Sequence, residues 1–159
     1  VKIRLQNNPI GLDTFKALGA NPIVLPVGDV FASLQTGVID AAENNEPTFD
    51  TENYVVAGTK YFDLTEHFMI PEVLAFSKRK WSKLSADDQA LIMKLAKEAQ
   101  AEERVLWAEY VEKSKQRLQS QGVKFLPVDK KPFVDATAPV REKYGKQFSE
   151  LMQQIQDTK

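Results

Sequence analysis

Five polar side chains follow one another closely after a short apolar run near position 40. The acids are Asp40, Glu43 and Glu46, and the amides among them are Asn44 and Asn45. Two such carboxylates could act as general acid and base, so an enzyme that acts on a sugar is one alternative for this chain. Together with the amides they could hold Ca²⁺ or Mg²⁺, although their spacing matches no EF-hand loop. Because carboxylates are also common in solvated loops, we expect neither a catalytic pair nor a metal site here.

Arg4 is the clearest candidate for binding an anion. Val1, Ile3 and Leu5 alternate with Lys2 and Arg4, which predicts a strand with the apolar residues on one face and the basic residues on the other. A guanidinium group matches a carboxylate through two parallel hydrogen bonds. Its position near the end of a strand makes Arg4 a candidate ligand-binding residue.

Several kinds of chemistry lack the residues that they need. The only histidine is His67, the sequence contains no cysteine, and no G-x-S-x-G, P-loop or G-x-G-x-x-G motif occurs. A zinc site built from His and Cys is therefore not expected. We interpret His67 as a structural hydrogen-bonding residue and the two tryptophans as packing residues. The sequence predicts no catalytic residue, no metal and no cofactor.

Composition restricts the partners. The 21 basic and 22 acidic residues give a formal net charge of −1, and nothing resembles the basic surplus of a nucleic-acid-binding protein. No apolar run approaches the roughly 20 residues of a membrane helix. The chain opens at Val1 inside a predicted strand, without Met or a signal peptide, so we expect it to be a fragment of a longer protein.

Alternating strands and helices are predicted to position the polar residues. Strand patterns cover residues 1–5, 23–25 and 38–39, and helical patterns lie between them. This order predicts an α/β fold with a parallel sheet and right-handed crossovers. Ligands of open parallel sheets bind beyond the carboxyl ends of the strands. We therefore expect three segments to meet at one ligand-binding edge: residues 4–8, 26–28 and 43–46.

The rest of the chain is predicted to be mainly helical. Ser85 with an acid three residues later predicts the start of a helix over residues 86–121, about 54 Å long at 1.5 Å per residue. That length exceeds the width of one small domain. A helix is also expected over roughly 47–57, and another from Pro139. A helical interaction module built from the later helices is a further alternative function.

Two stretches between these helices are predicted to be extended. They are residues 61–64 and 72–77, and we expect the apolar residues of the second stretch to be buried.

Three motifs resemble those of a known transport family. They are D-T-F-K-A-L-G-A-N-P at 13–22, G-D-V-F-A-S-L-Q-T-G-V-I-D at 28–40, and E-N at 43–44. In this order and spacing they resemble the extracytoplasmic solute receptors of TRAP transporters, the DctP-like family. The resemblance extends over essentially the whole chain. It implies a periplasmic-binding-protein-like architecture of two α/β lobes, with a long helix spanning both lobes.

The resemblance also implies how this chain is divided. It would be about the C-terminal half of a receptor, with residues 1–69 and 110–159 forming most of the C-terminal ligand-binding lobe. Residues 70–109 would contribute to the largely missing N-terminal lobe. Such a receptor is periplasmic, is not an enzyme, and delivers a small carboxylate ligand to a TRAP membrane permease. With half of the cleft missing, we expect the fragment to bind ligand weakly or not at all, or to associate with a second copy that covers exposed apolar surface.

The family implies roles for individual residues. Arg4 matches the arginine that forms a salt bridge with the ligand carboxylate, and Asn44 matches an asparagine that touches the ligand. Val27 matches a residue that packs over the ligand and is aromatic in some relatives. We expect Glu43 to point away from the ligand, because neighbouring residues in an extended segment face opposite sides.

The ligand implied is a sugar acid. E-N-N-x-P at 43–47, L-T-E-H at 64–67 and P-E-V-L at 71–74 resemble the branch of the family that binds hexuronates. Side-chain amides suit a polyhydroxylated ligand because they both donate and accept hydrogen bonds. Such amides occur at Gln6, Asn7, Asn8 and Asn45.

Overall fold

A three-stranded parallel sheet organises the first half of the chain in this computed structural model, which describes residues 1–158. The strand order is β2-β1-β3, so β1 lies in the middle. Arg4 on β1 pairs with Ile23 on one side and with Ala42 on the other. The predicted α/β fold with parallel strands is confirmed. The strands are β1 (Lys2–Leu5), β2 (Asn21–Val24) and β3 (Ala41–Ala42).

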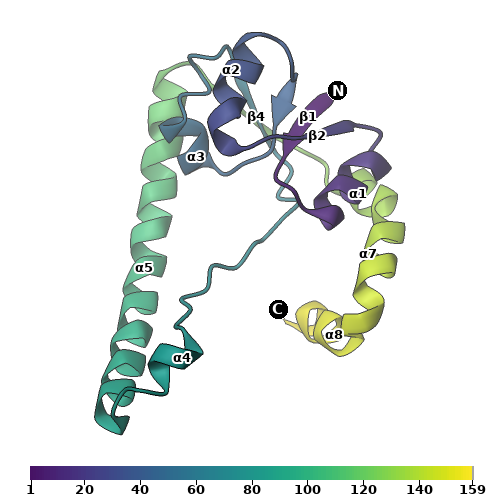
Figure 1. The fold of residues 1–159 in the computed structure, drawn as a ribbon. Coiled ribbons are helices and arrows are strands. Elements are labelled where there is room, and N and C mark those ends of the chain that lie inside the picture. Colours follow the sequence, from purple (N-terminus) through teal and green to yellow (C-terminus); the bar gives the residue numbers. More distant parts are fainter. Residues whose placement is uncertain (159) are drawn as a thin grey trace.

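Short helices connect these strands and cover the sheet (Figure 1). They are α1 (Pro9–Ala17), the 3-10 turn η1 (Val27–Asp29) and α2 (Val30–Gln35). The third strand begins later than predicted. Val38 is exposed and only Ile39 is buried in the core. The apolar pair at 38–39 therefore lies just before the strand and not within it.

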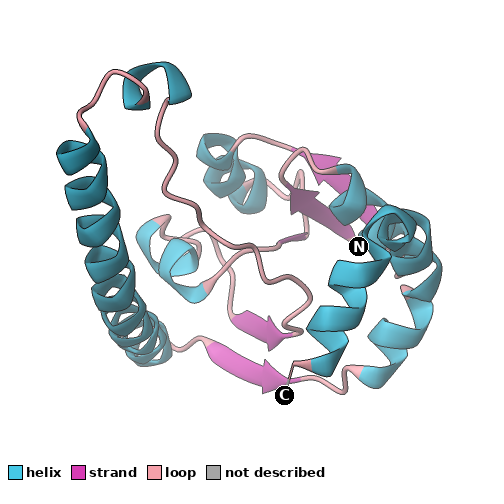
Figure 2. Ribbon diagram, turned by 90° about the horizontal axis from the view of Figure 1, so that it is seen from below, coloured by secondary structure: helices cyan, strands magenta, loops and turns pink. Residues whose placement is uncertain are grey.

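A second parallel pair joins distant parts of the chain. β4 (Tyr61–Leu64) lies beside β5 (Lys124–Pro127), as Figure 2 shows. The core lies between the two sheets and the end of the long helix. It consists of Val30, Ile39, Phe49, Tyr54, Leu118 and Val123.

The long helix α5 (Ala86–Ser120) is a single element of 35 residues, which confirms the prediction. The Ser85 hydroxyl accepts a hydrogen bond from the Asp88 amide at 3.1 Å and caps its start. Gly122, with φ of 90°, ends it in a conformation that glycine adopts without strain. Its buried residues, Ser114 and Leu118, lie only near its C-terminal end.

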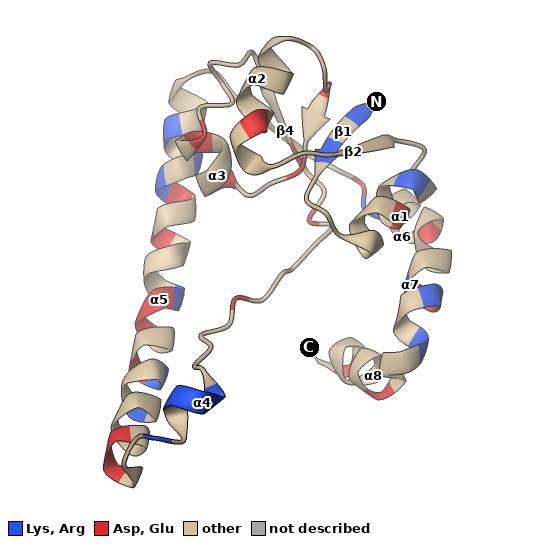
Figure 3. Ribbon diagram, viewed as in Figure 1, with Lys and Arg blue, Asp and Glu red and all other residues tan. Residues whose placement is uncertain are grey.

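The remainder of α5 carries charges of both signs along its length (Figure 3). Its apolar residues there, such as Leu95 and Leu106, are exposed. Among residues 1–158, no helix combines the length and the apolar character needed to cross a membrane.

Three predictions about the remaining elements were wrong. The helix from Pro47 is short, and the helix from Pro139 is broken at Lys146 by a 3-10 turn. The apolar run within 72–77 is not buried, since Val73 is 81% and Leu74 is 83% exposed. Within residues 1–158, no element covers Val73 and Leu74, whereas Phe76 packs edge-on against Trp81 of α4, to which the run leads in an irregular path (Figure 1). The remaining helices are α3 (Glu46–Thr51), α4 (Lys78–Trp81), α6 (Lys131–Ala136), α7 (Ala138–Gly145), η2 (Lys146–Phe148) and α8 (Ser149–Asp157).

The uneven burial of α5 predicts unequal effects of the same substitution on one helix. Leu118→Ala should lower the free energy of unfolding by about 2–5 kcal/mol, because Leu118 is fully buried in the core. Leu106→Ala, at an exposed position, should change it by no more than about 0.5 kcal/mol. Urea denaturation of the 159-residue chain measures both. Equal losses for the two variants would contradict the described core.

Candidate functional site

Arg4 is buried at the centre of the sheet and is incompletely satisfied. The residue is 1% exposed, and its Nε donates a hydrogen bond to the Leu25 carbonyl at 2.9 Å. Its Nη1 is buried and has no hydrogen-bond partner among residues 1–158. Within the same residues, Arg4 forms no ion pair. A buried cationic donor without a partner is costly, and an anionic ligand would relieve that cost.

The position of Arg4 follows from the order of the strands. Because β1 is the middle strand, its carboxyl end is flanked by the ends of β2 and β3. The Leu25 amide still bonds to the Leu5 carbonyl, and the Glu43 amide bonds to the Arg4 carbonyl. The three segments predicted to meet at one edge of the sheet therefore begin next to one another.

We expected Glu43 to point away from the ligand, and the structure places it beside two other candidate residues. Its side chain lines a small cavity together with Gln6 and Asn8. One carboxylate oxygen is 4.0 Å from Nε2 of His67. Only two residues of β3 have strand geometry, so alternation along a longer strand does not set the direction of Glu43.

Burial favours the neutral forms of both Glu43 and His67. It raises the pKa of Glu43, while the charge of Arg4 and the backbone of Gln6 act in the opposite direction. Burial also lowers the pKa of His67. His67 Nδ1 lies at hydrogen-bonding distance, 2.7 Å, from the Thr65 hydroxyl, and its buried Nε2 has no partner among residues 1–158.

The candidate asparagines use their side-chain oxygens within the chain. Asn8 Oδ1 accepts from the Ile10 amide at 2.9 Å and caps α1. Asn45 Oδ1 caps α3 in the same way, accepting from the amide of Thr48 at 2.9 Å. Asn44 Oδ1 accepts from the Asn45 amide. The side-chain oxygen of each asparagine is therefore engaged within the chain, whereas its NH₂ group can only donate a hydrogen bond.

Tyr54 is a residue that the sequence pattern did not identify. It is buried, and its hydroxyl has no hydrogen-bond partner among residues 1–158. Burial raises its pKa, whereas the Arg4 charge and the Asn44 side chain act to lower it. The influence of Arg4 and Asn44 on this pKa indicates that Tyr54 lies near both of these candidate residues. A single tyrosine within a predicted helix carries no sequence signal for this role.

Two further candidates, Asp40 and Val27, are separated from this cluster. Asp40 accepts a hydrogen bond from the Lys2 amide at 2.7 Å, at the opposite end of β3 from Glu43. Val27 lies in η1, is 45% exposed and does not line the cavity beside Glu43. No group of three or more His, Asp or Glu side chains within residues 1–158 is arranged to hold a metal ion.

Comparison with known proteins matches the chain to one family. The family model described as bacterial extracellular solute-binding protein, family 7 (DctP), matches residues 1–147. A solute-binding protein of Chromohalobacter salexigens is 37% identical over 159 residues, which are 99% of this chain and 47% of that protein. The chain spans about half the length of the curated relatives that it matches.

Solved structures with the same fold contain sugar acids. A TRAP periplasmic solute-binding protein from Pseudomonas putida F1 with bound D-glucuronate is 48% identical and has a TM-score of 0.94. Another, from Bradyrhizobium, in complex with D-galacturonate, is 40% identical with a TM-score of 0.90. This chain is covered to 99% in both comparisons, and it covers 51% and 53% of those two chains. The predicted architecture, about half of a two-lobe periplasmic binding protein, is confirmed.

The burial of His67 predicts its titration. Because it is the only histidine, its ring protons give one set of resonances in proton NMR. We expect its pKa to lie below the ordinary value of 6.5. The unfolded chain then binds this proton first as the pH falls, so the chain loses stability between the unfolded and the folded pKa of His67.

His67→Gln provides the comparison, since this variant should lack that part of the pH dependence. A measured pKa above 6.5 would contradict the prediction and would indicate that an ionised Glu43 pairs with a charged His67.

Proposed function

This chain belongs to the DctP family of bacterial extracellular solute-binding proteins, and from that premise we propose that it is part of a periplasmic TRAP receptor. The receptor binds a small organic acid anion, specifically a sugar acid such as a hexuronate, and delivers it to a membrane permease. The observation that carries this proposal is the buried Nη1 of Arg4, a cationic donor without a partner among residues 1–158.

The chemistry of a hexuronate matches the groups around Arg4. Its carboxylate suits the guanidinium group, and its hydroxyl oxygens can accept from the NH₂ groups of Asn8, Asn44 and Asn45, whose side-chain oxygens are already engaged. Gln6 beside the cavity adds a further amide. Relatives with bound D-glucuronate and D-galacturonate support this ligand class. Val27 would pack against the sugar from its exposed position in η1.

We assign residues 1–69 and 110–159 to the lobe that carries Arg4. Residues 70–109 would pack against a second lobe formed by the remainder of a longer protein. The exposed apolar residues of both the 72–77 segment and the first part of α5 support this division. The half-length match to the relatives supports it as well.

Closure of the two lobes would retain the ligand. When water is excluded, the local dielectric constant falls and the attraction between Arg4 and the carboxylate increases. Contacts made only in the closed form would shift the equilibrium toward it. The permease would then recognise the closed receptor, with α5 as the element that both lobes share.

Arg4→Lys tests the proposed contact while keeping the charge. We expect at least a tenfold loss of D-glucuronate affinity in the full-length protein, because lysine loses the planar fork and the bond to the Leu25 carbonyl. Isothermal titration calorimetry measures the affinity. Arg141→Lys on α7 is the matched control and should bind like the wild type. Equal affinities of wild type and Arg4→Lys would reject the assigned role.

A receptor should release its ligand chemically unchanged. Incubation of the full-length protein with D-glucuronate, followed by NMR of the sugar, should therefore recover all of it. A new sugar product that is lost in Glu43→Gln would instead favour the carboxylate-dependent enzyme.

A further inference from the structure

The segment that carries Asn44 and Asn45 leads directly into a very short helix. α3 has six residues, and isolated helices of that length are unstable in water. Its stability must therefore come from packing and polar contacts with the rest of the chain. Pro47 and Phe49 supply the buried apolar face.

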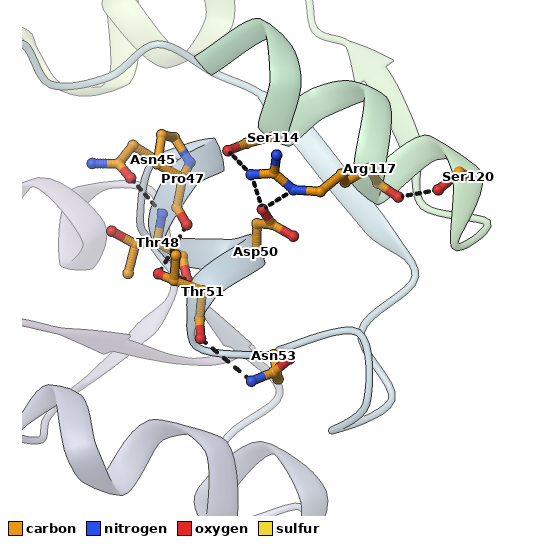
Figure 4. A network of polar contacts seen from close by, with 9 residues as sticks. All are labelled: Asn45, Pro47, Thr48, Asp50, Thr51, Asn53, Ser114, Arg117 and Ser120. Carbon is orange, nitrogen blue, oxygen red and sulfur yellow. Dashed lines mark hydrogen bonds and ion pairs between the residues drawn. The ribbon is translucent and has the colours of Figure 1, made fainter. Parts of the chain in front are cut away.

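Asp50, on the polar face of α3, forms an ion pair with the long helix. Arg117 on α5 donates from Nε to Asp50 Oδ2 at 2.7 Å, and its Nη2 lies 2.5 Å from the same oxygen. The same Nη2 donates to the Ser114 hydroxyl at 3.1 Å. Figure 4 shows these three side chains meeting between the two helices.

Burial gives this contact more weight than an ordinary surface pair. Ser114 is fully buried and the Asp50 side chain is only 11% exposed, whereas the Arg117 side chain is 47% exposed. Two guanidinium nitrogens on one carboxylate also fix the orientation of both partners. The other ion pairs of α5, such as Lys113 with Glu109, join residues one turn apart on its exposed surface.

We propose that the network of Asp50, Arg117 and Ser114 positions the Asn44–Asn45 loop for ligand binding by fixing α3 to α5. This inference rests on the proposed function, and it adds residues that do not touch the ligand. Because α5 continues into the part assigned to the second lobe, the network also links the ligand loop to the element that crosses between the lobes. Asp50 and Arg117 are therefore positioning residues.

Asp50→Asn in the full-length protein tests the proposal. The variant keeps the shape of the side chain but removes the charge that holds Arg117. We expect at least a tenfold weaker affinity for D-glucuronate by calorimetry at 25 °C, with an unchanged far-UV circular dichroism spectrum. Asp135→Asn, which breaks the exposed pair with Lys131 on α6, is the matched control and should bind like the wild type.

A double variant distinguishes a positioning role of Asp50 from a general effect on stability. If Asp50 acts through Asn44, then Asp50→Asn should cost little further affinity in a protein that already carries Asn44→Ala. An undiminished loss in that background would overturn the proposal, as would wild-type affinity of the single variant Asp50→Asn.

Hydrogen exchange tests, without ligand, whether the network of Asp50, Arg117 and Ser114 fixes α3. Amides of residues 44–51 should exchange faster in Asp50→Asn than in the wild type and in Asp135→Asn. If the wild-type protein binds no hexuronate, the proposed function fails, while exchange still decides the present inference. Unchanged exchange in Asp50→Asn would overturn it.

Discussion

The burial of one guanidinium group is the constraint on which the site depends. Arg4 occupies the middle strand of a small sheet, where a charge is costly unless hydrogen bonds or an opposite charge compensate it. Within residues 1–158, its Nε donates to the Leu25 carbonyl, and its Nη1 has no hydrogen-bond partner. Tyr54 nearby also has an unpaired buried hydroxyl. Such an arrangement is expected of a binding site, where the ligand completes the hydrogen bonds.

The long helix connects this site to the remainder of the molecule. Its last turns hold the core through Leu118 and hold α3 through Arg117. Its earlier turns are exposed over most of their surface. The C-terminal end of α5 is thus packed against the core and α3, whereas the rest of the helix is exposed. Under the proposed division into two lobes, that exposed part would contact the second lobe, which would account for a helix of 35 residues.

Short sequence patterns predicted the elements whose alternating or capping residues lie close together in the chain. The alternation at Val1–Leu5 predicted β1, and the Ser85 cap predicted the start of α5. Patterns failed where burial depends on distant or absent neighbours. Val73 and Leu74 are exposed because no described element covers them. Glu43 lines a cavity whose other residues include Phe68 and Ile70, which are distant in the sequence. Arg4 was a candidate from its position near a strand end, and its role stays a prediction that its burial and unpaired Nη1 support.

A crystal structure of the full-length protein with D-glucuronate tests the central claim most directly. The account predicts electron density for the sugar beside β1, with a carboxylate oxygen within about 3.2 Å of the Arg4 Nη1 atom. Density for the carboxylate against a different cation, with that nitrogen still unpaired, would contradict it.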